Sequence, residues 1–138
     1  MSIDSSVEKR FIETVRNREL LPEGCSIAAA VSGGADSIAL LELLQRFRNH
    51  MNWSILVVHI DHGARPESGV EADYVRRVAD EAGLEFRLLS ISPPDSGSME
   101  DHFSRERQSI YTELGRGGFM VATGPNADDR AETLLIRL

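Results

Sequence analysis

Apolar residues recur along the chain at two spacings, one typical of helices and the other of buried strands. Val7, Phe11 and Val15 repeat every four residues, which predicts that residues 5–20 form a helix with one buried face. Residues 54–60 (SILVVHI) are instead β-branched and almost continuously apolar, as in a strand that is covered on both faces. The chain is therefore expected to mix helices with buried strands.

The same two patterns assign the other elements. The predicted strands are residues 26–31, 54–60, 85–91 and 119–123, and the predicted helices are residues 5–20, 36–47, 70–82, 98–114 and 127–138. After the first helix, strands and helices alternate, which is typical of an α/β fold with an open parallel sheet and helices on both faces. No repeat or linker interrupts the pattern, so we expect a single domain over residues 1–138. Because the last apolar helical run has neither a cap nor a closing strand, we also expect this domain to be part of a longer one.

Composition narrows the class of protein. The chain has 138 residues, of which 41% are hydrophobic and 27% charged, as in a globular domain. Its net charge of -7 makes it a poor stand-alone binder of nucleic acid, because affinity for phosphates comes from clustered cations. Cys25 has no second cysteine to pair with, and no apolar run reaches the roughly 18–20 residues of a membrane span. We therefore expect a cytoplasmic protein with no membrane partner.

Three loops follow predicted strands, at the sheet edge where α/β proteins bind ligands. The first carries Ser32, Gly33, Gly34, Ala35, Asp36 and Ser37. Its glycines allow a tight turn, and the helix that follows offers free N–H groups and serine hydroxyls to an anion. Asp36 would repel a phosphate unless a cation such as Mg²⁺ lies between them. The structural alternative is a plain turn with Asp36 as the helix N-cap.

The second loop, residues 59–68, is rich in polar groups. His59 and His62 flank Asp61, which permits a metal site, although no third ligand is predicted nearby. The plainer roles are an Asp61 that accepts hydrogen bonds from ribose or amine groups and an Arg65 that contacts phosphate. Polar residues that end a strand and cap a helix would also explain His59.

The third loop, residues 122–133, contains three carboxylates. Asp128, Asp129 and Glu132 follow a cap at Asn126, and acidic residues in the first turns of a helix favour its dipole. That is the structural explanation. Three carboxylates at a ligand-binding edge also suit Mg²⁺, a lysine ammonium group, or both.

These loops resemble those of a known family. SGGADS after an apolar strand looks like the SGGxDS pyrophosphatase loop (PP-loop) of the ATP-pyrophosphatase superfamily. Residues 59–68 (HIDHGARPES) resemble the HxDHGxRPES segment of tRNA(Ile)-lysidine synthases, and residues 123–133 are similar to their TGHNADDQAET motif. Pro125 stands where the family has histidine, and Arg130 where it has glutamine. A weaker similarity on the fourth predicted helix aligns Glu100 with a lysine contact.

The resemblance implies a fold and a reaction. The fold would be adenine nucleotide α-hydrolase-like, with strand order 3-2-1-4-5 and a sheet truncated before its last strand, which would lie beyond Leu138. Domains that bind tRNA would follow. ATP with Mg²⁺ would adenylate the C2 oxygen of the wobble cytidine of tRNA(Ile) carrying a CAU anticodon. Free L-lysine would then displace AMP to give lysidine.

Roles for residues follow from the same resemblance. Residues 32–37 would bind ATP, with Asp36 and Asp129 holding Mg²⁺, and these two aspartates together with Asp61 would be the catalytic groups. The substrate-binding residues would be Arg65, Glu100, Asp128 and Glu132. A homodimer is a further partner that the resemblance allows.

Two alternatives stay open. The chain could be another PP-loop enzyme, acting on a different tRNA base or on a small amide substrate. A single cysteine, Cys25, disfavours sulfur transfer, and the HIDHGARPES segment favours lysidine synthesis. The chain could instead be a nucleotide-binding module without catalysis, an interpretation that Pro125 and Arg130 favour.

Overall fold

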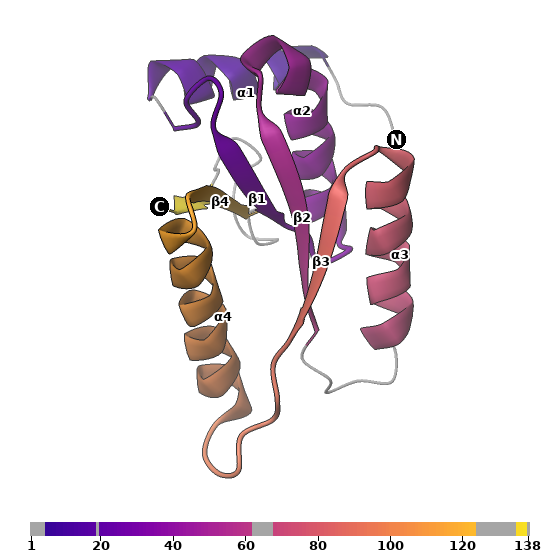
Figure 1. Ribbon diagram of the computed structural model, residues 1–138, viewed down its shortest axis with the longest axis vertical. Helices are drawn as coiled ribbons and strands as arrows, with labels where there is room; N and C mark the ends of the chain where they lie inside the picture. The colour runs from indigo at the N-terminus through magenta and orange to yellow at the C-terminus, as the bar shows by residue number, and fades with distance from the viewer. Residues whose placement is uncertain (1–4, 19, 62–67, 124–134, 138) are drawn as a thin grey trace.

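The computed structural model describes residues 5–18, 20–61, 68–123 and 135–137 (Figure 1). Its elements in chain order are α1 (Ser5–Asn17), β1 (Ser26–Ala30), α2 (Ala35–Met51), β2 (Ser54–Asp61), α3 (Ser68–Glu81), β3 (Glu85–Ser90), α4 (Met99–Arg116), β4 (Phe119–Thr123) and β5 (Leu135–Arg137). In this part of the chain, no helix combines the length and the apolar character needed to cross a bilayer.

The strands form one sheet in the order β3-β2-β1-β4-β5. The pairings from β3 through β2 and β1 to β4 are all parallel, which confirms the four predicted strands and their orientation. In register, Ala30 lies between Val58 of β2 and Thr123 of β4. The carboxyl ends of these central strands therefore meet at one edge of the sheet.

The end of the chain corrects one prediction. Residues 135–137 form β5, which pairs antiparallel with β4, whereas the pattern predicted a helix over residues 127–138. The remainder of that predicted helix, residues 127–134 and 138, lies outside the described residues. A short apolar run is compatible with either element, and here it satisfies backbone groups at the outer edge of β4 that would otherwise lack ladder partners. The sheet is therefore parallel only as far as β4.

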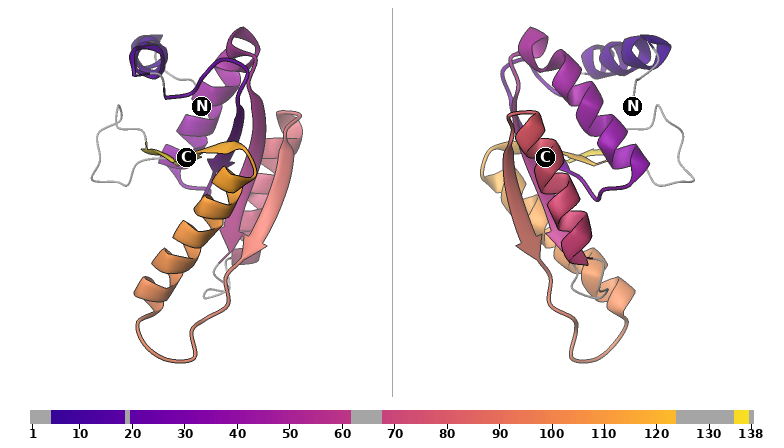
Figure 2. Two further views of the ribbon diagram at one scale, coloured as in Figure 1. Left: turned by 60° about the vertical axis from the view of Figure 1, so that its left-hand side comes forward. Right: turned by 90° about the vertical axis from the view of Figure 1, so that its right-hand side faces the viewer.

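Helices cover both faces of the sheet, as predicted. In the two side views of Figure 2, α2 and α3 lie on one face and α4 on the other. Alternate residues of β1 divide between these faces, because Ile27 and Ala29 pack into the cluster beneath α2 and α3 while Ala28 packs beneath α4. Helix α1 lies against α2, where the rings of Phe11 and Phe47 stack with centroids 5.9 Å apart.

Candidate functional site

The candidate site lies where β1 ends and α2 begins. The connection between them, residues 31–34, leaves the sheet between the carboxyl ends of β2 and β4, and the candidate segment 32–37 continues into the first turn of α2. This is the switch point of the parallel strand order, because β2 and β4 lie on opposite sides of β1. Both other candidate loops begin at the same edge, one after Asp61 and the other after Thr123.

Two serines hold the first loop in shape. The Ser37 hydroxyl donates to the carbonyl oxygen of Gly34 at 3.0 Å and accepts from the backbone N–H of Ser32 at 3.2 Å. The Ser32 hydroxyl lies 3.2 Å from that of Ser37 and accepts from the N–H of Gly34, also at 3.2 Å. Ser37 is buried, so its hydroxyl braces the loop from inside. The phosphate contact expected of Ser37 would require this hydroxyl to turn away from Gly34.

The two glycines take different conformations. Gly33 has φ +98°, which L side chains rarely adopt, and it rests against Tyr74 and Val75 of α3. Gly34 is extended and is the N-cap of α2. The alternative in which Asp36 caps the helix is therefore wrong, because the helix begins at Ala35, before that residue.

The first turn of α2 presents backbone donors at this edge. The first intrahelical hydrogen bond runs from the N–H of Ile38 to the carbonyl oxygen of Gly34, at 3.1 Å. The N–H groups of Ala35, Asp36 and Ser37 therefore have no acceptor within the helix, and Gly34 has no side chain to supply one. Such groups, at the positive end of the helix dipole, suit an anion such as a phosphate.

Two carboxylates lie at this edge of the sheet, one on a helix and one on a strand. Asp36 is exposed in the first turn of α2, and Asp61 is the partly exposed last residue of β2. The described residues contain no group of three or more His, Cys, Asp or Glu side chains placed to hold a metal ion. Asp36 nevertheless fits Mg²⁺, which commonly takes one or two carboxylates and completes its shell with substrate phosphates and water.

His59 is a structural residue of the strand end. Its side chain is 3% exposed, and Nδ1 lies 2.8 Å from the carbonyl oxygen of Val31. This agrees with the interpretation of His59 as a polar residue that ends a strand, and among the described residues no metal cluster includes it. The sequence does not show that the partner of His59 is the residue just before the loop. A histidine within a β-branched buried run was the available signal.

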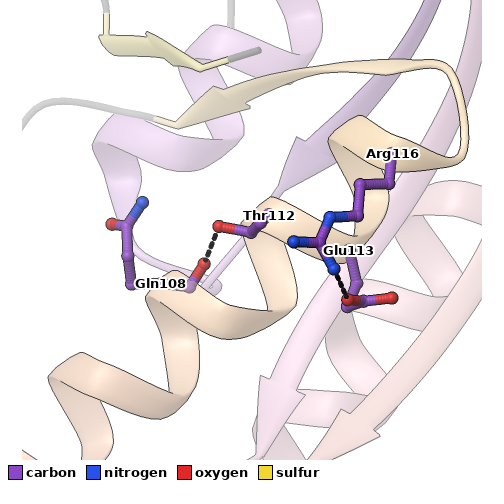
Figure 3. Close-up of polar contacts among 4 residues, drawn as sticks. All are labelled: Gln108, Thr112, Glu113 and Arg116. Carbon is purple, nitrogen blue, oxygen red and sulfur yellow. Dashed lines mark hydrogen bonds and ion pairs between the residues drawn. The ribbon is translucent and has the colours of Figure 1, made fainter.

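Glu100 lies on helix α4, a different element from the candidate loop. Glu100 is exposed in the first turn of α4, which is capped by the Ser98 hydroxyl accepting from the N–H of Asp101 at 3.3 Å. Two polar contacts on the outer face of α4 are internal to the helix (Figure 3). There the Thr112 hydroxyl donates to the carbonyl oxygen of Gln108 at 2.9 Å, and Arg116 pairs with Glu113 at 3.0 Å.

Several residues singled out from the sequence lie outside the described part of the chain. They are His62, Arg65, Pro125, Asn126, Asp128, Asp129, Arg130 and Glu132. Their roles stay predictions.

Comparison with known proteins found similarity over nearly the whole chain. The PP-loop domain family matches residues 3–138. Three curated relatives named tRNA(Ile)-lysidine synthase come from Synechococcus sp. (36% identical), Symbiobacterium thermophilum (37%) and Ruegeria pomeroyi (40%). The matches cover 94%, 94% and 81% of this chain. The chain spans only 40%, 28% and 27% of the lengths of these relatives.

Among solved structures, the chain is similar to the U34-tRNA thiolase NcsA from Methanococcus maripaludis, solved with its 4Fe–4S cluster. The TM-score is 0.76, with 17% identity over 91% of this chain and 46% of the thiolase chain. At this identity the likeness concerns the fold alone.

Proposed function

The chain belongs to the PP-loop domain family, and on this premise we propose that it binds ATP at residues 32–37 and uses it to adenylate a substrate oxygen, releasing pyrophosphate. The observation that carries the proposal is the uncapped first turn of α2. Its first N–H groups, which have no acceptor among the described residues, follow a glycine loop that two serines hold in shape at the switch point of the sheet. Donors fixed in advance stabilise charge on the phosphates without reorganising during the reaction.

Asp36 and Asp129 are proposed to hold Mg²⁺ beside the phosphates. When bound, the cation would offset the negative charge of ATP and let the Asp36 carboxylate stand near a phosphate. Exposure of Asp36 in the first turn of α2 supports this role.

We propose further that the adenylated oxygen is O2 of the wobble cytidine of tRNA(Ile) carrying a CAU anticodon. The ε-amine of free L-lysine then attacks C2, the bond from C2 to the adenylated oxygen breaks, AMP leaves, and the attacking nitrogen loses a proton. The names of the curated relatives and the similarity of residues 59–68 support this substrate.

The attack by lysine requires acidic side chains and a general base, because the ammonium group must be bound and then deprotonated. Asp61, Glu100, Asp128 and Glu132 are proposed to supply these contacts. Arg65 is proposed to meet phosphate or RNA. The net charge of -7 offers few clustered cations for phosphates, so we propose that other parts of the full-length protein, or a second subunit of a homodimer, supply much of the affinity for tRNA.

A second candidate is a nucleotide-binding module without turnover. The substitutions that favour it are Pro125 and Arg130, which stand at the histidine and glutamine positions of the synthase motif. Such a module would bind ATP at residues 32–37 without exchanging pyrophosphate.

The test supplies the full-length protein with ATP, Mg²⁺, labelled lysine and unmodified tRNA(Ile) with a CAU anticodon. Incorporation of lysine that depends on ATP is expected. Incorporation of a different group would support another PP-loop reaction, and ATP binding without any exchange of pyrophosphate would support the module.

Asp36→Asn provides the matched variant. It is expected to lower ATP–pyrophosphate exchange by about a hundredfold or more, since it removes a charge that holds the cation at the phosphates. Asp80→Asn makes the same change at an exposed position of α3 and should leave exchange unchanged. Equal rates of pyrophosphate exchange in the Asp36 variant and the wild type would show that Asp36 does not hold the cation.

A further inference from the structure

Both backbone groups of Val31 are held by β2. Its N–H donates to the carbonyl oxygen of Val58 at 2.9 Å, which extends the ladder between β1 and β2 by one residue. Its carbonyl oxygen lies 2.8 Å from Nδ1 of His59, the residue that follows Val58. Val31 and His59 are both buried, with 2% and 3% of their surface exposed.

The direction of the second hydrogen bond follows from its partners. A carbonyl oxygen only accepts, so Nδ1 of His59 carries the hydrogen. In the neutral imidazole this leaves Nε2 without one, and the contact thereby fixes the tautomer. Without this donor the buried carbonyl oxygen would be an unsatisfied hydrogen-bonding group, which lowers the stability of the fold. The contact is therefore a strong local constraint.

The constrained peptide is the one that leads into the candidate ATP loop. Ser32 follows Val31 directly, and Gly33 then takes its positive φ. The loop is thus anchored at its entry by His59 and braced inside by Ser37, which accepts from the N–H of Ser32.

We propose that His59 is a positioning residue for residues 32–37. By holding the carbonyl oxygen of Val31, it sets the direction in which Ser32 and Gly33 leave β1 and hence where the free N–H groups of α2 point. It acts through the loop and does not touch the nucleotide. This inference rests on the ATP-binding part of the proposed function.

Three variants separate positioning from folding. His59→Leu introduces an apolar side chain of similar volume and removes the N–H donor. His59→Asn instead keeps an N–H donor close to the position of Nδ1. His50→Leu makes the same chemical change in the last turn of α2, where His50 is exposed and paired with Arg16. All are made in the full-length protein and assayed well below their unfolding temperatures.

The KM for ATP in pyrophosphate exchange is expected to rise about tenfold in the His59→Leu variant, as for loss of one hydrogen bond. The rate at saturating ATP should stay within about threefold. His59→Asn and His50→Leu should keep the wild-type KM to within about threefold. A variant that merely folded less well would have a lower rate at an unchanged KM. The proposal would be overturned if His59→Leu gave that result, or if His59→Asn did not keep the wild-type KM.

A second readout needs no ATP. Nitrogen NMR of the His59 imidazole should show the hydrogen on Nδ1, and hydrogen exchange at the amides of Gly33 and Gly34 should be faster in His59→Leu than in the wild type. An Nε2–H tautomer or unchanged loop exchange would contradict the inference. If the wild type itself fails to bind ATP, the proposed function fails, and these NMR measurements still decide whether His59 positions the loop.

Discussion

At the scale of single residues, Gly33 decides the shape of the candidate loop. A side chain at φ +98° is strained, although the space around it is adequate, since a Cβ would lie 3.7 Å from Val75 and 3.8 Å from Tyr74. Gly33→Ala is therefore expected to lower the free energy of unfolding by about 1 kcal/mol or more. Urea denaturation followed by circular dichroism measures it.

Gly69 provides the control for this prediction. It lies in the first turn of α3 with no positive φ, and a Cβ there would meet nothing within 4 Å. Gly69→Ala should raise the free energy of unfolding by roughly 0.5 kcal/mol, because alanine restricts the unfolded chain and favours helix. Equal effects of the two substitutions would contradict the assignment of strain to Gly33.

Cys25 allows a pH prediction because it is the only cysteine. Partial burial raises the pKa of its thiol above the ordinary value, and a backbone hydrogen bond offsets part of that rise. The thiolate is the reactive form, so the folded chain should react with a disulfide reagent at a higher midpoint pH than the urea-unfolded chain. Because the pKa is raised on folding, the thiol's contribution to stability is present below the unfolded pKa and is lost as pH rises through the folded pKa. A folded midpoint at or below the unfolded one would refute the prediction.

At the scale of elements, the buried and exposed faces of α4 contribute very different amounts to the free energy of unfolding. Leu114 is 7% exposed and packs against Ala28 and Val121, so Leu114→Ala should cost about 2–5 kcal/mol of unfolding free energy. Glu113→Gln breaks the pair with Arg116 on the solvent face (Figure 3) and should cost less than about 0.5 kcal/mol, since both partners are exposed. Urea denaturation of both variants checks the contrast, and comparable losses would show that the outer face of α4 is not simply solvated.

Elements with a strong pattern were predictable from the sequence, and the weakly patterned end of the chain was not. Residues 54–60 were assigned as a strand from their continuous β-branched run, and β2 confirms them with one residue added. Residues 135–137 were assigned to a helix and form β5. The physical reason is that three residues carry no periodicity, so the open edge of β4 decides their conformation.

At the scale of the whole molecule, the clusters on the two faces of the sheet are built on the same strands, so we expect them to unfold as one cooperative unit. The single tryptophan, Trp53, is 3% exposed on the side of α2 and α3, and its Nε1–H donates to the carbonyl oxygen of Pro22 at 3.1 Å. Because the strands are shared, the α4 side should unfold together with Trp53. Tryptophan fluorescence and far-ultraviolet circular dichroism should therefore give the same urea midpoint. Loss of helical signal before any change at Trp53 would show that α4 separates first.

Periodicity and local chemistry within a few residues were enough to predict the order of helices and strands through β4, the two-faced α/β fold and the loop at residues 32–37. The roles expected for Arg65, Asp128, Asp129 and Glu132 remain predictions. Only the tertiary structure decided that Gly34 caps α2, that Ser37 turns inward, and that His59 holds Val31. The last of these joins residues 28 positions apart. That contact depends on the register between β1 and β2, which the pattern along a single strand does not encode.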